Sequence, residues 1–274
     1  MDDLAFANVY APDQLVKMEP GVILPFSLGP FVEFLMHLEA ETLPRAAIDW
    51  LNIGRSSDFV TAWLQGHPQW HSPNSHLGFI RTRGYSDSWY MESTSFLMKA
   101  GQAARDISRL PGSVPGQMAA AIQELEGNIH EHSEAVSTGV LVFRATNGVF
   151  EFVVADHGIG LLRSLRSSPM YADLNDHGSA LRIALTDGAS RYNDPLRGHG
   201  FRPIFQGLTD LYGYLRFRTG DHAIVMDGTN PALATAQVSQ KTRMGGFFAS
   251  VRCGNGVRGR GSNWQSTLHG ESAK

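Results

Sequence analysis

The sequence Glu124-Leu-Glu-Gly-Asn-Ile-His-Glu-His-Ser133 lies in a run of residues with helical periodicity. The apolar residues of this run recur at every third or fourth position: Met118, Ile122, Leu125 and Ile129. This spacing, after a start signal at Ser113, predicts a helix with one buried stripe. At about 100° per residue, Glu124, Asn128 and Glu131 lie together on a flank beside that stripe. The helix therefore presents a carboxylate and an amide side by side on a rigid support.

These two side chains have a definite chemical use. The carboxylate of Glu124 can orient or deprotonate a water molecule, and the oxygen of Asn128, one turn later, is a suitable ligand for Mg²⁺. Taken alone, the pair is also typical of an ordinary solvated helix face. Glu126 points off this flank, and we expect its substitution to leave the chemistry unchanged.

Composition and charge exclude several classes of protein. The chain has 23 Lys and Arg against 26 Asp and Glu, a net charge of −3, which gives no basic surface for nucleic acid or for an acidic membrane. Its single cysteine, Cys253, excludes an internal disulfide framework and fits a reducing compartment. We expect the Cys253 side chain to fill space near the end of a strand. The chain shows no signal peptide pattern and no apolar stretch of ~18 residues, so we expect a cytoplasmic protein without a membrane span.

The length of 274 residues allows two domains. We interpret residues 1–97 as a small α/β module, for which a regulatory role is one option, with strands near residues 21–25 and 47–53 and helices near 30–40 and 59–64. The histidines among Pro, Gly, Ser and Asn in this module are interpreted as a polar loop rather than a metal cluster: His67, His71 and His76. A second domain is expected over residues 98–253, led in by a helix from Ser93 to about residue 110 and followed by a flexible tail over 254–274.

Within the second domain, two β-rich runs over residues 138–146 and 149–156 are joined by Asn147-Gly148. Asn-Gly between apolar alternations is a strong hairpin signal. The hairpin delivers Asp156 at its end, directly before His157-Gly-Ile-Gly160. A carboxylate followed by glycines that let the backbone turn can accept a hydrogen bond from an exocyclic amine, such as that of adenine, although a strand also commonly ends in Asp and Gly for turn reasons alone.

Two short helices are expected next, over residues 161–167 and 176–186, before the sequence Arg197-Gly-His-Gly-Phe201. Glycines that precede a helix, here predicted over residues 201–211, free backbone N–H groups to bind an anion, so the pattern is consistent with a phosphate site. The same pattern also fits a plain helix start. The domain is expected to end in three antiparallel strands: residues 214–219, 223–226 and 246–253.

In combination, these motifs resemble those of the GHKL superfamily of ATPases and kinases, over about residues 100–253. Glu124-Leu-Glu-Gly-Asn128 resembles the N box, Asp156-His-Gly-Ile-Gly160 the adenine-binding G1 box, and Gly198-His-Gly200 the G2 box. The segment between the latter two resembles the ATP lid. The resemblance implies a Bergerat α/β sandwich of two layers, in which helices pack on one face of a mixed, largely antiparallel sheet.

The resemblance also implies roles for individual residues. Glu124 would be the catalytic base, Asn128 the Mg²⁺ ligand and Asp156 the reader of adenine. The remaining nucleotide-binding positions would be the glycines that approach the nucleotide and the residues at the phosphates: Gly158, Gly160, Arg197, Gly198, His199, Gly200 and Phe201.

We therefore expect an ATP- and Mg²⁺-binding protein that hydrolyses ATP to ADP slowly and signals through closure of its lid. Two alternatives stay open: a protein kinase of the anti-sigma type, and a non-catalytic nucleotide sensor. The His-Glu-x-x-x-Pro dimerisation motif of sensor histidine kinases is absent from the sequence, which argues against a self-contained histidine kinase. The expected partner is another protein, a homodimer being one option, and no nucleic acid or membrane is expected.

Overall fold

The computed structural model describes residues 28–44, 57–185, 213–227 and 236–254. Several predictions lie outside these residues: the strands near 21–25 and 47–53, the sequence Arg197 to Phe201, the helix over 201–211 and nearly all of the tail.

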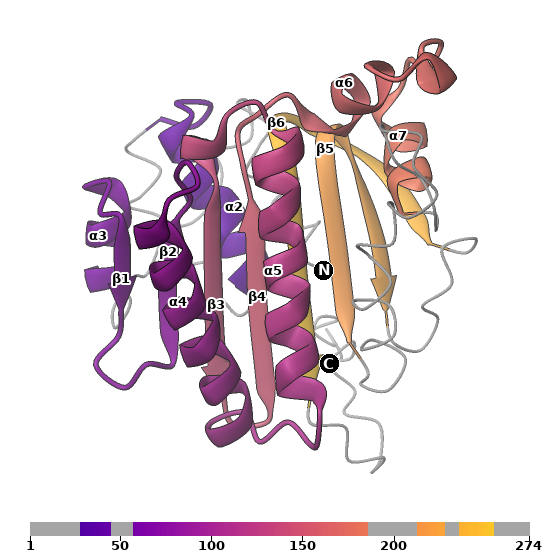
Figure 1. Cartoon of the computed structure of the whole chain (residues 1–274). Helices are drawn as coiled ribbons and strands as arrows, with labels where there is room; N and C mark the ends of the chain where they lie inside the picture. The colour runs from indigo at the N-terminus through magenta and orange to yellow at the C-terminus, as the bar shows by residue number, and fades with distance from the viewer. Residues whose placement is uncertain (1–27, 45–56, 186–212, 228–235, 255–274) are drawn as a thin grey trace, which may run out of the picture.

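The described strands form one six-stranded sheet in the order β1-β2-β3-β4-β6-β5 (Figure 1). Its members are β1 (Gln69–His71), β2 (Leu77–Arg81), β3 (Val140–Thr146), β4 (Val149–Ala155), β5 (Tyr214–Asp227) and β6 (Gln237–Gly254). Neighbouring strands are antiparallel at every pairing in the described sheet, which is more uniform than the mixed, largely antiparallel sheet that was expected. The chain is thus of the mixed α/β class, as predicted.

The predicted hairpin is confirmed as β3 and β4. Their register runs from Val140 opposite Ala155 to Thr146 opposite Val149, so that only Asn147 and Gly148 remain for the turn. Gly148 has φ 78°, a conformation that a residue with a Cβ adopts only with strain.

The prediction of three strands at the end of the domain is wrong, because β5 and β6 are each one long strand. Gly220 and Asp221 do not form a hairpin turn. The register instead shifts between Thr219 and His222, which marks a β-bulge, and Gly220 takes up the distortion with φ 55°. Beyond the bulge β5 continues to pair with β6, from His222 opposite Gln240 to Val225 opposite Gln237.

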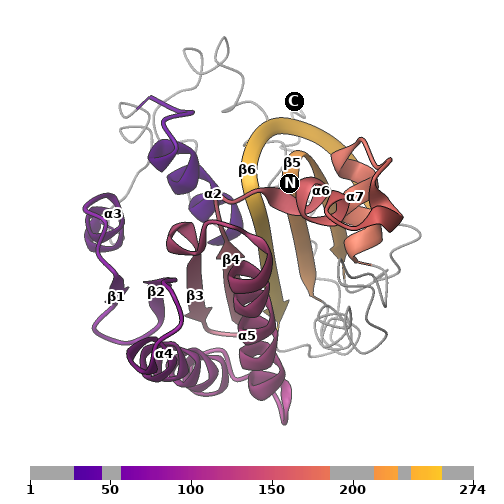
Figure 2. The ribbon, with the colours of Figure 1, turned by 45° about the horizontal axis from the view of Figure 1, so that its top comes forward.

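Two helices lie side by side on one face of the sheet: α4 (Asp87–Asp106) and α5 (Val114–His132) (Figures 1 and 2). The predicted helix around Glu124 is confirmed as α5. Helix α4 begins before the predicted Ser93, because the Ser86 side chain accepts a hydrogen bond from the Trp89 backbone N–H and caps the helix there. Helix α6 (Gly160–Arg166), a 3₁₀ turn η5 (Pro169–Tyr171) and α7 (His177–Ala184) come after β4, and α7 packs against β5.

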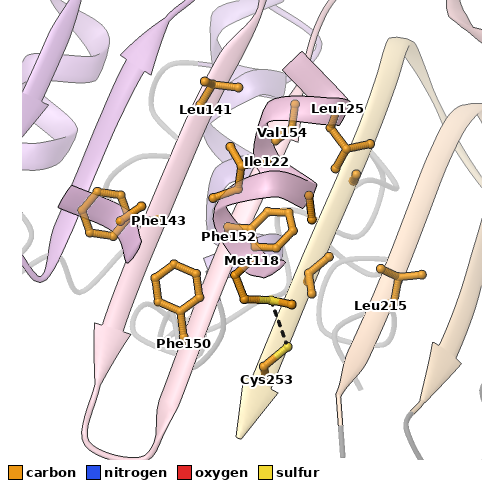
Figure 3. Close-up of a cluster of buried hydrophobic side chains, with 14 of the residues drawn as sticks. Met118, Ile122, Leu125, Leu141, Phe143, Phe150, Phe152, Val154, Leu215 and Cys253 are labelled. Carbon is orange, nitrogen blue, oxygen red and sulfur yellow. Dashed lines mark hydrogen bonds between the residues drawn. The ribbon is translucent and has the colours of Figure 1, made fainter. Parts of the chain in front are cut away.

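The strands bury both of their faces. On β4, Phe152 and Val154 point into the core beneath α4 and α5, a part of which Figure 3 shows, whereas Val153 and Ala155 point to the opposite face. That opposite face is covered by α2 (Leu28–Glu39) and α3 (Ser57–Leu64) (Figure 2). Helices therefore lie on both faces of the sheet, one layer more than the two-layer sandwich that the resemblance implies.

Helix α2 is tied to β5 by buried charges. The carboxylate of Glu33, fully buried, pairs with the guanidinium groups of Arg216 and Arg218, which are buried as well. Because β5 alternates, its intervening residue Phe217 faces the opposite core with α4 and α5. One strand thus links the two sides of the sheet.

The part of the chain predicted as a separate N-terminal module shares this sheet. Strand β2 pairs with β3, and helix α4 runs across the predicted boundary between residues 97 and 98. The polar-loop interpretation is wrong for His71, which lies in β1 with its ring 5.7 Å from that of Phe96. Burial there lowers the pKa of His71 to about 4.

Candidate functional site

Asp156 lies directly after β4, on the face of the sheet that α5 covers, since it continues the alternation of Phe152 and Val154. Its side chain is 3% exposed, and its Oδ1 accepts a hydrogen bond of 2.7 Å from the Gly158 backbone N–H. Burial raises the pKa of Asp156 to about 6, and the backbone N–H groups of Gly158 and Phe247 partly oppose that rise. A carboxylate offers about four acceptor positions, so capacity remains for a ligand's N–H.

The glycines after Asp156 are required by the chain's own packing. A Cβ at Gly158 would collide with the carbonyl oxygen of Ser133, the residue that ends α5, and the Ile159 N–H donates to that same oxygen at 2.9 Å. Gly160 has φ 72°, and a Cβ there would lie 2.7 Å from the Thr219 hydroxyl oxygen. The loop over residues 156–160 is thus held between the end of α5 and strand β5.

Two residues of this region carry a role that the sequence interpretation missed. The Thr219 hydroxyl, fully buried at the bulge of β5, accepts a hydrogen bond from the Leu161 N–H (3.1 Å) and donates one to the Gly246 carbonyl oxygen (2.9 Å). Gly246, on β6, has φ 70° and packs directly against Asp156. Glycines inside β-rich runs were the available signal, because they mark bulges and close backbone approaches.

Helix α5 carries both Glu124 and Asn128. Glu124 is exposed and Asn128 is half-buried. On the other side of the helix, Glu126 contacts α4, so by the helical repeat Glu124 and Asn128 face away from α4, toward the side of β6 and β5 (Figure 1). Asn128 lies just over one turn before Ser133, where the loop that carries Asp156 contacts the helix.

The side of α5 toward α4 holds a second group of titratable side chains. The Trp89 indole N–H donates a hydrogen bond of 2.9 Å to Glu126, whose carboxylate lies 3.7 Å from His130 Nε2, and the exposed Tyr85 ring stacks on His130 at 4.0 Å. Burial raises the pKa of Glu126 and lowers that of His130. Glu126 does point off the predicted flank, but it is buried between two helices, so it is unsuitable as the neutral control that was expected.

The structure thus brings three of the predicted positions, Asp156, Gly158 and Gly160, into one loop that contacts the C-terminal end of α5, the helix that carries Asn128 and Glu124. Arg197, Gly198, His199, Gly200 and Phe201 lie outside the described residues. Within the described ranges, no three His, Cys, Asp or Glu side chains converge as a metal centre would require.

Comparison of the chain with protein-family models, with curated proteins and with solved structures found no match. Among the helices that the structure describes, none combines the length and the apolar character that crossing a bilayer demands.

Proposed function

We propose that the chain binds ATP with Mg²⁺ beside α5 and hydrolyses it slowly to ADP and phosphate. The observation that supports this most directly is the buried carboxylate of Asp156 at the end of β4. Burying a carboxylate is costly unless hydrogen bonds compensate it, and among the described residues the compensation for Asp156 comes from backbone N–H groups. The exocyclic amine of adenine would supply a further donor, whereas guanine presents a carbonyl oxygen at that position.

Two residues on the flank of α5, Asn128 and Glu124, support the proposed Mg²⁺ binding and hydrolysis. Asn128 would contribute one oxygen to a Mg²⁺ ion, which when bound would neutralise charge on the phosphates. Glu124, one turn earlier on the same flank, would orient a water molecule against the terminal phosphate and take up its proton. Residues 197–201, which resemble the phosphate-binding motif, would complete the site.

Signalling would pass through the segment after Asp156. The Leu161 N–H at the start of α6 donates a hydrogen bond to Thr219 of β5, and α7 packs against the same strand. A shift of the loop that would hold the adenine would therefore reach both α6 and α7. We propose that α6 and α7 belong to a lid that responds to the terminal phosphate and that a partner protein reads this response.

The exposure of Glu124 favours a second candidate function, a nucleotide-dependent interaction module without turnover. A base gains most when water is excluded around it, and in the described residues Glu124 faces solvent. ATP labelled at the γ-phosphate separates the candidates: released free phosphate supports the hydrolase, a labelled protein partner supports a kinase, and binding without either supports the module.

Nucleotide binding itself is tested by calorimetry with ATP and GTP in the presence of Mg²⁺. We expect ATP to bind more tightly than GTP, and Asp156→Asn to weaken ATP binding by about ten- to a hundredfold, the worth of one hydrogen bond to a charged group. The matched control is Asp58→Asn, an exposed carboxylate at the start of α3 on the other face of the sheet. Equal binding by wild type and Asp156→Asn would refute the proposed site.

A further inference from the structure

Helices α4 and α5 leave a groove of about 540 Å³ between their outer surfaces, on the side away from the sheet. Its lining is largely apolar or small and includes Tyr90, Leu97, Met98, Gly101, Ala119 and Ala120. The described part of the chain places no other element over it (Figures 1 and 2). Two large apolar side chains of the lining are exposed, Tyr90 at 69% and Met98 at 62%, and Met91, next to Tyr90 on α4 but outside the lining, is 65% exposed. Such a concentration on one helix is typical of an interaction surface.

Helix α4 carries two faces of different kinds. The face toward the sheet is buried, with Trp89, Phe96 and Ala100 in the core. The outer face bears a second stripe, spaced alternately by four and three residues, as in the seam of a coiled coil: Asp87, Met91, Thr94, Met98, Gly101 and Arg105. The outer stripe is therefore arranged like a helix-packing seam, although the described residues leave it open.

Gly101 gives a separate indication. A glycine inside a helix destabilises it relative to alanine. A Cβ at this position would meet only ordinary contacts, 3.9 Å to the Pro115 carbonyl oxygen and 4.0 Å to the Ala119 Cβ. Packing within the described chain therefore does not require a glycine here, whereas the close approach of a further helix would.

We propose that the groove is occupied by α4 of a second copy of this chain, running antiparallel. The six residues of the outer stripe are spaced symmetrically about position 96 of α4, so two antiparallel copies of the stripe can pair residue by residue. In the antiparallel arrangement Asp87 faces Arg105 of the second copy, Met91 faces its Gly101, and Thr94 faces its Met98. Each large side chain then meets a smaller one, and opposite charges meet at both ends.

Charge selects this arrangement over a parallel one. The first turn of α4 is acidic at Asp87 and its last turn is basic at Arg105. A parallel pair would set Asp87 against Asp87 and Arg105 against Arg105. The antiparallel pair avoids both repulsions and closes with two-fold symmetry, which gives a dimer rather than an open chain of copies. The competing ion pair of Arg105 with Asp106 is 3.4 Å long and well exposed, so it is weak.

The proposal does not depend on nucleotide binding, because the groove is lined by the side of α5 toward α4, whereas Glu124 and Asn128 lie on the flank turned away from α4. The test is sedimentation velocity of the full chain across micromolar concentrations. We expect a concentration-dependent dimer, and we expect Met98→Lys to raise its dissociation constant by tenfold or more, since a charge would enter an apolar seam. Met170→Lys is the matched control, because Met170 is 65% exposed but lies on η5, away from the groove.

Charge reversal provides the decisive variants. Asp87→Arg alone and Arg105→Asp alone should each weaken the dimer, and the doubly reversed chain should recover it, because opposite charges again face each other. A chain that stays monomeric overturns the proposal. So does a dimer that Met98→Lys leaves unchanged, or one that the double reversal does not restore.

Discussion

The indole N–H of Trp89 on α4 donates a hydrogen bond of 2.9 Å to the carboxylate of Glu126 on α5, and both side chains are buried. This polar contact joins two helices that also share an apolar core. The side of α5 that carries Glu126 is therefore packed against α4. Glu124, which is exposed, and Asn128, which is half-buried, lie on the opposite flank.

Replacing Glu126 should therefore affect stability in a way that depends on the substitute. Glu126→Gln keeps an oxygen that accepts from Trp89, whereas Glu126→Ala leaves the buried indole N–H without its acceptor, at a cost of about 1–3 kcal/mol in the free energy of unfolding. Urea denaturation measures both variants. If the alanine variant were as stable as the glutamine variant, the hydrogen bond would contribute nothing to folding.

Asp156 should make stability depend on pH. Its pKa rises from 3.8 to about 6 on folding, so the folded state binds the proton more tightly than the unfolded state. The resulting stabilisation is fully present below about pH 4 and is lost as the pH rises to about 6, a change of up to about 3 kcal/mol. Stability of the wild type relative to Asp156→Asn should therefore fall over this interval in urea denaturation at several pH values. A relative stability that rises with pH would mean that a cation stabilises the charged form.

Titration of Asp156 should also affect ATP binding, but in the opposite direction to its effect on stability. The charged carboxylate is the better acceptor for an amine, so ATP affinity should decline as the pH falls below about 6. Asp156→Asn should flatten that part of the pH profile. A profile equally steep in the variant would assign the titration to another group.

Glu124 decides whether the proposed site turns over ATP. General-base assistance contributes ~10²–10⁴ in rate, so Glu124→Gln should nearly abolish phosphate release and leave ATP affinity largely intact. Glu131→Gln is the control, because Glu131 is exposed as well and shares the flank about two turns after Glu124. Wild-type turnover in the Glu124 variant would favour the interaction module over the hydrolase.

Asn128 and Mg²⁺ should act as one unit. Removal of the ion with EDTA and the substitution Asn128→Ala should each weaken ATP binding, and the two effects should not multiply when combined. Calorimetry on the four combinations measures the coupling. Multiplying effects would place the ion away from Asn128.

Local sequence patterns predicted a large part of the fold. Periodicity was sufficient for α5, because its apolar stripe is long and regular, and Asn147-Gly148 was sufficient for the β3–β4 hairpin, because that dipeptide favours one kind of turn. Cys253 was predicted to fill space, and it lies buried on β6 with its thiol 3.5 Å from the Met118 thioether of α5 (Figure 3).

Long-range pairing was beyond these patterns. Nothing local shows that β2 pairs with β3, whose partner residues lie about 60 positions later, or that α2 covers the far face of the sheet. The Gly220-Asp221 pair was taken for a turn because glycine with a short polar residue signals both turns and bulges. Only the pairing of His222 and its neighbours with β6 distinguishes the two.

In the candidate site, too, local sequence patterns predicted some residues and missed those that depend on long-range contacts. Local patterns are enough to place the strand end and the helix flank that carry Asp156, Glu124 and Asn128. Thr219 was missed because its importance comes from contacts with Leu161 and Gly246, which are distant in the chain. A lone threonine in a strand carries no signal of such contacts.

The buried pairing of Glu33 with Arg216 and Arg218 bears on where this chain can be divided into fragments. The motifs resembling a nucleotide site all lie after residue 100, so a fragment over residues 98–253 would be the obvious smaller unit. Such a fragment would keep both arginines in the sheet and lose the carboxylate between them, and separating a buried ion pair costs about 3–5 kcal/mol. The unit that keeps these buried charges paired is therefore longer than the stretch that carries the motifs, because a cut at residue 98 would separate both arginines from Glu33.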